Sequence, residues 1–280
     1  MKEIYNSYNG TLTPSTQPLF SALNRSFRFG DSCFESMVVF KGQCINLPLH
    51  VERIRKATAA LKMQLPAHFD LDFVQQQVQE LLLRNEFENA RVRLTFFRND
   101  GGVYQPETNT ASFVIEAFAH DRSGFELNAE GLNIDVFEEE RKNEHSVLSN
   151  YKTGNSLSFV LASLYKQEKG FDECIILNTK GQIAEFISCN FFLVKDDIIY
   201  TPPLSEGCIG GVMRSNIINL CRGKNLPLRE ETLTLDKAME ANEVFVSNAV
   251  YGVQWVKQFR NKSYTNETSS KLMALLQNEL

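Results

Sequence analysis

The segment Glu173–Pro203, "ECIILNTKGQIAEFISCNFFLVKDDIIYTPP", contains three apolar runs that are separated by two turn signals. The turn signals are Thr179-Lys-Gly and Lys195-Asp-Asp, whose polar and glycine residues favour chain reversal. Apolar runs of this length, bounded by turn residues, predict β-strands. We therefore expect this part of the chain to form the centre of a β-rich domain.

Helices and further strands are predicted on both sides of this segment. Upstream, "LNIDVF" indicates a strand, and a helix follows in "SLSFVLASLYKQEKG", closed by Gly170. Downstream, a helix is expected over about 212–222, then strands in "EVFVSNAV" and "GVQWVKQF" and a terminal helix with leucines at helical spacing. The segment thus lies within a mixed α/β arrangement.

The first third of the chain predicts a smaller α/β domain. "SCFESMVVFKGQCINL" reads as two strands around a Lys-Gly turn, and "ARVRLTFFR" alternates as a strand does. Two helices lie between them, the second with Asp70 or Asp72 as its N-cap. A polar break at 120–124 is the candidate linker. At 280 residues two domains are expected, a small N-terminal one over 1–121 and a larger, β-rich one over 122–280.

Composition excludes several classes of function. A net charge of −5 argues against a nucleic-acid surface, because phosphate binding needs clustered cations. No apolar run approaches membrane-spanning length. The six cysteines are far apart and form no CxxC pair, which predicts free thiols, no metal site, and a reducing, cytoplasmic location.

Four polar features could carry chemistry, and each also has an ordinary structural interpretation. Lys152, in "SNYKTGN", is either a surface charge or a reactive amine; Glu185, within an apolar run, is either buried with a partner or points to water from an edge strand. Arg53 is either solvated or clamps a phosphate. The glycines of "EGCIGGVMR" are either a turn or an anion site before a helix. Metalloprotease, triad and nucleotide-loop motifs do not occur.

These four features all lie in segments that resemble the motifs of one protein family. The segments "RFGDSCFESMVVFKGQCINLPLHVERIRKATAAL", "YKTGN", "GQIAEFISCNFFLV", "GGVMR" and "NEVFVSNAVYGVQWV" resemble the class IV aminotransferases in order and spacing, from about residue 28 to 259. These are the fold-type IV enzymes dependent on pyridoxal 5′-phosphate (PLP). They include branched-chain and D-amino-acid aminotransferases and 4-amino-4-deoxychorismate lyases.

The resemblance implies a cofactor and a role for each feature. Lys152 corresponds to the Schiff-base lysine, Glu185 to the acid that keeps the pyridine nitrogen protonated, and Arg53 to the phosphate-binding arginine. The rest of the phosphate cradle corresponds to the backbone of Val212 and Met213 and the turn at Asn248 and Ala249. Family members take a small amino substrate and are homodimers, with the site between the two domains.

Two reactions remain open within this family. Met213 and Ala249 lack the hydroxyl groups that branched-chain aminotransferases place near the phosphate, which favours the lyase that releases pyruvate and leaves 4-aminobenzoate for folate biosynthesis. Glu35 favours an aminotransferase, because some lyases carry threonine there. Glu35, Arg98 and Tyr104 are candidates for substrate binding, although Arg98 and Tyr104 could simply be parts of a polar hairpin tip. Retention of the lysine, acid and arginine argues against a non-catalytic scaffold.

Overall fold

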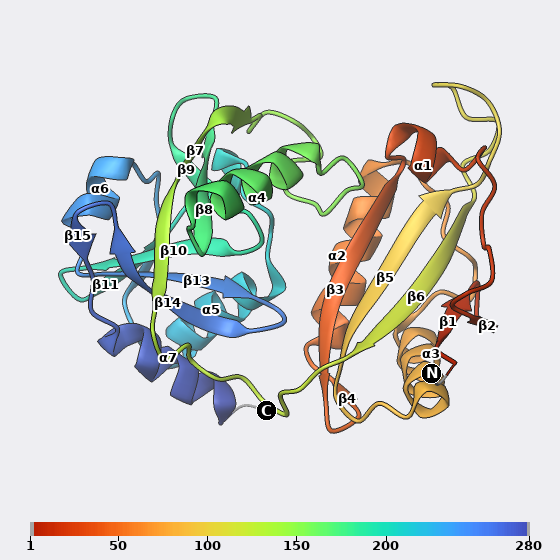
Figure 1. Cartoon of the computed structure of the whole chain (residues 1–280), viewed down its shortest axis with the longest axis horizontal. Coiled ribbons are helices and arrows are strands. Elements are labelled where there is room, and N and C mark those ends of the chain that lie inside the picture. Colours follow the sequence, from red (N-terminus) through yellow and green to blue (C-terminus); the bar gives the residue numbers. More distant parts are fainter. Residues whose placement is uncertain (1–2, 279–280) are drawn as a thin grey trace. The chain divides into compact units, whose positions relative to one another are not determined.

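The computed structural model describes residues 3–278, which form two compact units. The first contains the chain up to Ser123 together with Tyr151–Asn155, and the second contains Gly124–Asn150 and the chain from Ser156 onward. The segment that carries Lys152 thus belongs to the first unit, although its place in the sequence suggests the second. Figure 1 shows the elements of both units.

The first unit contains a wholly antiparallel six-stranded sheet of order β2-β1-β6-β5-β3-β4. Hairpin contacts between strands close in sequence account for most of this order. Its elements are β1 (Tyr5–Tyr8), β2 (Thr11–Pro14), α1 (Arg25–Phe29), β3 (Ser32–Phe40), β4 (Gln43–Cys44), α2 (Leu47–Ala60), α3 (Leu71–Asn85), β5 (Ala90–Arg98) and β6 (Ala111–Ala119).

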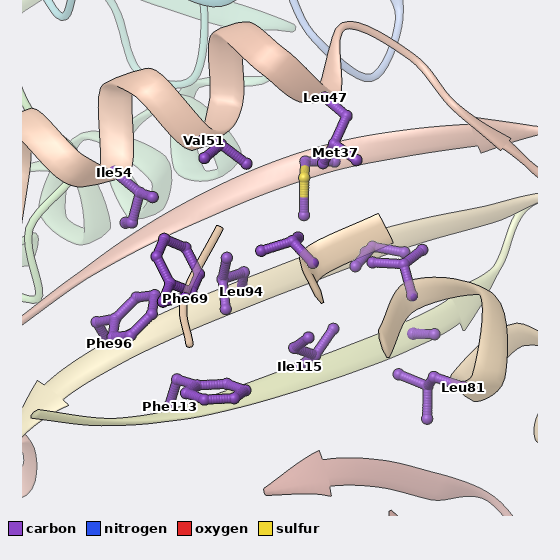
Figure 2. Close-up of a cluster of buried hydrophobic side chains, with 14 of the residues drawn as sticks. Met37, Leu47, Val51, Ile54, Phe69, Leu81, Leu94, Phe96, Phe113 and Ile115 are labelled. Atoms are coloured by element: carbon purple, nitrogen blue, oxygen red, sulfur yellow. The ribbon is translucent and has the colours of Figure 1, made fainter. Parts of the chain in front are cut away.

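Helices α2 and α3 cover one face of this sheet (Figure 2). Alternate strand residues point to the same face, so Leu94, Phe96 and Phe113 all reach the apolar layer under the helices. Asp70 is the N-cap of α3, because its carboxylate accepts a hydrogen bond of 2.8 Å from the backbone N–H of Phe73. The layer fixes α2 against β3, the two elements that carry Arg53 and Glu35.

The second unit contains a mixed nine-stranded sheet of order β12-β11-β10-β13-β14-β7-β8-β9, with β15 also paired to β14. Three of its strand pairs are parallel, namely β14 with β7, β7 with β8, and β11 with β12. The strands are β7 (Leu132–Lys142), β8 (Glu173–Asn178), β9 (Ile183–Phe186), β10 (Asn190–Lys195), β11 (Ile198–Thr201), β12 (Leu228–Glu230), β13 (Glu243–Asn248), β14 (Gly252–Phe259) and β15 (Lys262–Ser263). The helices are α4 (Leu157–Lys169), α5 (Val212–Gly223), α6 (Leu235–Glu240) and α7 (Glu267–Gln277), with a 3₁₀ turn at Leu204–Glu206.

The segment Glu173–Pro203 contains four strands, β8 to β11, whereas its three apolar runs predict three. The middle run is broken between β9 and β10, where the N–H of Phe186 bonds to the carbonyl of Cys189 over 2.9 Å. The buried carboxylate of Glu173 accepts hydrogen bonds from the Ile187 N–H (3.2 Å) and the Ser188 hydroxyl (3.3 Å). The apolar run does not predict this break, because the carboxylate that bonds to the residues at the break belongs to Glu173 on β8, a different strand. The α/β fold class itself is confirmed. No helix in the described part of the chain has the length and apolar character needed to cross a membrane.

Candidate active site

Lys152 is fixed by backbone pairing to the start of β3. The N–H of Phe34 donates to the Lys152 carbonyl over 2.9 Å, and the N–H of Gly154 donates to the Ser32 carbonyl over 2.8 Å. A Cβ atom on Gly154 would lie 2.3 Å from the Ser32 hydroxyl oxygen, so the glycine of "KTGN" permits this close approach. The Lys152 amine lies 5.5 Å from the centre of the Phe34 ring, a cation–π contact. The half-buried lysine is therefore held in place by its neighbours.

Arg53 and Glu35 form a buried, two-pronged ion pair in the first unit. Nε of Arg53 lies 2.7 Å from Oε1 of Glu35, and Nη2 lies 2.5 Å from Oε2. Nδ1 of His50 lies 2.6 Å from the same Oε2. Burial would raise the pKa of Glu35, but the charge of Arg53 and the hydrogen bonds from His50 and Arg53 lower the pKa to about 2. Glu35 is thus ionised, with both oxygens engaged by residues of α2.

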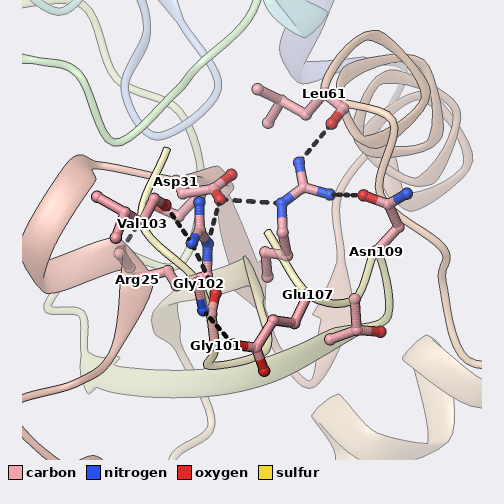
Figure 3. A network of polar contacts seen from close by, with 12 residues as sticks. Arg25, Asp31, Leu61, Gly101, Gly102, Val103, Glu107 and Asn109 are labelled. Carbon is pink, nitrogen blue, oxygen red and sulfur yellow. Dashed lines mark hydrogen bonds and ion pairs between the residues drawn. The ribbon is translucent and has the colours of Figure 1, made fainter. Parts of the chain in front are cut away.

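Arg98 has other partners than this cluster, and Figure 3 shows three of them, Asp31, Leu61 and Asn109. Nε of Arg98 donates to Asp31 over 2.9 Å, and its terminal nitrogens donate to the Asn109 side chain and to the Leu61 carbonyl, each over 2.6 Å. Tyr104 is 87% exposed. Substrate binding by either residue stays a prediction, and the acceptors around Arg98 indicate a role in holding the 99–110 hairpin.

Glu185 is buried in the second unit and is paired with Lys142. One carboxylate oxygen forms an ion pair with the Lys142 amine, and the other accepts a hydrogen bond of 2.9 Å from the Ile209 N–H. Glu185 is 2% exposed, so the alternative of an edge-strand acid facing water is excluded. A carboxylate has about four acceptor positions, so these two bonds leave capacity for a protonated ring nitrogen.

The start of α5 has the features of an anion site. Gly211 is the N-cap and supplies no side-chain cap, and α5 begins with the predicted residues Val212 and Met213. A Cβ atom on Gly211 would lie 1.8 Å from Oδ1 of Asn190, whose Nδ2 donates to the Ile209 carbonyl over 2.7 Å. Only glycine permits this approach, and backbone N–H groups at the start of a helix favour a bound anion.

Ser247, near the end of β13, supplies a hydroxyl group on the strand position that pairs with Asn190. Ser247 on β13 pairs with Asn190 on β10, so the two side chains lie on the same face of the sheet. Within residues 3–278, the buried Ser247 hydroxyl oxygen has no hydrogen-bond partner. Asn248 closes the following turn, because its Oδ1 accepts from the N–H groups of Val250 (3.0 Å) and Tyr251 (2.8 Å). Ala249 lies half-buried in that turn.

These groups fit the predicted cofactor. The unpartnered Ser247 hydroxyl and the uncapped start of α5 fit a phosphate ester, and the buried Glu185 carboxylate fits a protonated pyridine nitrogen. Lys152 supplies an amine. Among the described residues, no group of three or more His, Cys, Asp or Glu side chains could hold a metal ion. Glu185, Ser247 and the start of α5, which all belong to the second unit, therefore have the chemistry to hold PLP.

Comparison with known proteins identifies the family. The profile of amino-transferase class IV matches residues 32–259, so the chain belongs to this family. The aminodeoxychorismate lyase of Vibrio harveyi is 27% identical over 232 residues, which cover 82% of this chain and 83% of that protein. The branched-chain-amino-acid aminotransferase of Escherichia coli K12 is 26% identical over 254 residues, covering 88% of this chain and 82% of that protein.

Solved structures show the same fold. The branched-chain aminotransferase of Thermoproteus uzoniensis, determined with norvaline, superposes with a TM-score of 0.89 at 20% identity, covering 98% of this chain and 93% of that one. The family comparison thus includes both a lyase and aminotransferases, and the predicted class of a PLP-dependent lyase or aminotransferase is confirmed.

Three neighbours of the candidate residues were not assigned to the site from the sequence. Lys142 lies 43 positions before its partner Glu185, and no local pattern joins the two. Asn190 follows an apolar run and resembles an ordinary strand residue. For His50 the sequence does contain an indication: it lies three positions before Arg53 and hence on the same face of the helix.

Proposed function

We propose that this enzyme is a 4-amino-4-deoxychorismate lyase, which eliminates pyruvate from aminodeoxychorismate and leaves 4-aminobenzoate. The observation that carries the proposal is the absence of side-chain hydroxyls at Met213 and Ala249, beside the start of α5 and in the Asn248 turn. The branched-chain branch of the family has hydroxyl-bearing residues there. The likeness to the Vibrio harveyi lyase supports the same choice.

In this proposal the phosphate ester is held by the guanidinium of Arg53 and by backbone N–H groups of Val212 and Met213, with the Ser247 hydroxyl as a further donor. Asn248 and Ala249 form the adjoining turn. Glu185 accepts a hydrogen bond from the protonated ring nitrogen, and Lys142 and the Ile209 N–H hold its carboxylate in one orientation. When bound, PLP supplies an electron sink for the carbon that bears the substrate amine.

Lys152 moves the proton in the proposed reaction. Its amine, as the general base, takes the proton from the substrate carbon that carries nitrogen. The C–O bond to the enolpyruvyl group then breaks, the enolpyruvate takes up a proton to become pyruvate, and the remaining ring becomes aromatic. Placement of Lys152 by backbone hydrogen bonds suits this role, because proton transfer depends on a fixed donor–acceptor geometry.

An amino-acid aminotransferase of the branched-chain or D-amino-acid type is the second candidate. Glu35 supports it, since glutamate at this place is common among transaminases, and so does the likeness to the Escherichia coli enzyme. In the structure both Glu35 oxygens bond to Arg53 and His50, which does not favour a direct contact between Glu35 and a substrate.

A paired assay separates the two candidates. The purified protein with PLP is given aminodeoxychorismate while pyruvate and 4-aminobenzoate are measured, and separately an amino acid with 2-oxoglutarate while glutamate is measured. The lyase proposal expects equal amounts of pyruvate and 4-aminobenzoate, lost in Lys152→Ala. Rapid glutamate formation without pyruvate release would establish the aminotransferase instead.

We also propose a homodimer in the cytoplasm. An apolar stripe on α4 supports the dimer: Leu157, Val160, Leu161 and Leu164 recur at helical spacing and are each at least 43% exposed. Six free cysteines suit a reducing compartment. Light scattering of the eluting protein should give twice the mass of one chain, and Leu161→Glu should shift it to one chain. A monomeric wild type would exclude the dimer.

A further inference from the structure

Glu35 is placed by the sequence among the substrate ligands, but its contacts point to Arg53. The ion pair uses Nε and Nη2 of the guanidinium and both oxygens of the carboxylate, which is the geometry that fixes an arginine most firmly. Glu35 and Arg53 are 1% and 8% exposed. Because water cannot replace either partner, the carboxylate sets the direction in which the guanidinium points.

His50 extends the same arrangement. It lies one helical turn before Arg53 on α2 and contacts the Glu35 oxygen that Arg53 also contacts. Burial lowers the pKa of His50, although the hydrogen bond and charge of Glu35 oppose this shift. A neutral His50 donates from Nδ1 to Glu35. Its Nε2 atom is buried and has no hydrogen-bond partner in the described part of the chain. His50 thus adds a second contact to Oε2 of Glu35, the oxygen that also accepts from Nη2 of Arg53.

The charge balance makes the role of Glu35 testable. A phosphate site is ordinarily strengthened by positive charge, and a carboxylate within hydrogen-bond distance of Arg53 cancels much of that charge. If charge alone governed binding of the phosphate, removal of the Glu35 charge would strengthen it. If orientation governs binding, the same change weakens it, because planar recognition of phosphate requires the guanidinium fork to be aimed.

We propose that Glu35, held by His50, is a positioning residue that aims the Arg53 guanidinium at the phosphate of the cofactor. This inference rests on the proposed function in one respect, the assignment of Arg53 to the phosphate. It assigns Glu35 no contact with the substrate. It also explains why a chain with the other features of a lyase keeps a glutamate at this place.

The experiment compares the affinity of the full-length protein for PLP with its affinity for pyridoxal, which lacks the phosphate. For Glu35→Gln we expect about tenfold weaker binding of PLP and a change of less than about threefold for pyridoxal. Equal or tighter binding of PLP by Glu35→Gln would overturn the inference. Glu52→Gln is the matched control, since Glu52 lies on the same helix in an exposed pair with Lys56 and should change neither affinity.

A second pair of variants keeps the test decisive if Glu35→Gln does not fold. His50→Asn retains a donor toward Glu35, and His50→Leu does not. We expect the preference for PLP over pyridoxal to fall in His50→Leu and to be kept in His50→Asn, and equal preferences would overturn the inference. Failure of the assigned Arg53 role is distinguishable, because an Arg53→Leu variant would then keep the wild-type preference for PLP over pyridoxal.

Discussion

Lys142 at the end of β7 and Glu185 on β9 form an ion pair that is almost closed to water, with exposed side-chain fractions of 14% and 3%. The pair explains how an acid can lie within an apolar strand. Lys142 also places a positive charge beside Glu185, whose carboxylate we propose to bind the protonated ring nitrogen of the cofactor. Loss of the Lys142–Glu185 ion pair should therefore lower the stability of the folded protein.

Lys142→Met should lower the free energy of unfolding by about 3–5 kcal/mol, because a buried carboxylate is left without its cation. Denaturant titration at neutral pH measures this change. Lys195→Met is the matched control: the pair between Lys195 and Glu240 is exposed, so its loss should cost about 1 kcal/mol or less. Similar losses in the two variants would show that the buried pair contributes nothing special.

Gly211→Ala should weaken the start of α5. The added methyl group would meet the Asn190 side chain at 1.8 Å, so helix or side chain must shift, at a cost of about 1–3 kcal/mol. Affinity for PLP should fall with it. Gly223→Ala at the other end of the same helix has nothing within 4 Å of the added carbon, and its stability should stay within about 1 kcal/mol of the wild type. Unchanged PLP affinity in Gly211→Ala would argue against a phosphate at this helix end.

Asp31→Asn tests the interpretation of Arg98 as part of the scaffold. Oδ2 of Asp31 accepts from Nε of both Arg25 and Arg98, each over 2.9 Å (Figure 3). Loss of the charge leaves two buried arginines without their acid and should cost about 3–5 kcal/mol of unfolding free energy. Thermal unfolding followed by circular dichroism measures it. A fully stable Asp31→Asn variant with a raised KM for substrate would instead support the predicted role of Arg98 in substrate binding.

Glu35 should make the protein acid-sensitive. Its pKa is about 2 in the folded chain against an ordinary value of 4.5, so the ionised form stabilises the fold by about 3 kcal/mol. That stabilisation is present above pH 4.5 and is lost as the pH falls toward 2. The difference in unfolding free energy between wild type and Glu35→Gln should therefore shrink over this range. A difference independent of pH would show that the pKa of Glu35 is the same in the folded and unfolded chains, which would contradict a stabilising ion pair with Arg53.

Local signals in the sequence predict much of the fold, whereas the roles of Lys152, Glu185 and Arg53 follow from the family resemblance and stay predictions. The apolar runs around Ile175 and Phe192, and the N-cap at Asp70, are set by residues close together in the chain. The break between β9 and β10 was missed, because it depends on Glu173 in a neighbouring strand.

Partners that lie far apart in the sequence could not be predicted in this way. The contacts of Glu35 with Arg53 and His50 are an example, because they require α2 to pack on β3, and binding of substrate by Glu35 stays a prediction. The pairing of the Lys152 segment with Ser32 and Phe34, which joins it to the first unit, is likewise not predicted, because these residues lie more than a hundred positions apart. Such contacts arise from tertiary packing, which periodicity does not encode.

The most direct test of the central claim is to reduce the PLP-loaded protein with borohydride, digest it, and locate the modified peptide by mass spectrometry. The account predicts one phosphopyridoxyl group on the Nζ atom of Lys152, and none in Lys152→Ala treated in the same way. A modification on another lysine, or an unmodified Lys152 in a protein that still performs the reaction, would contradict it.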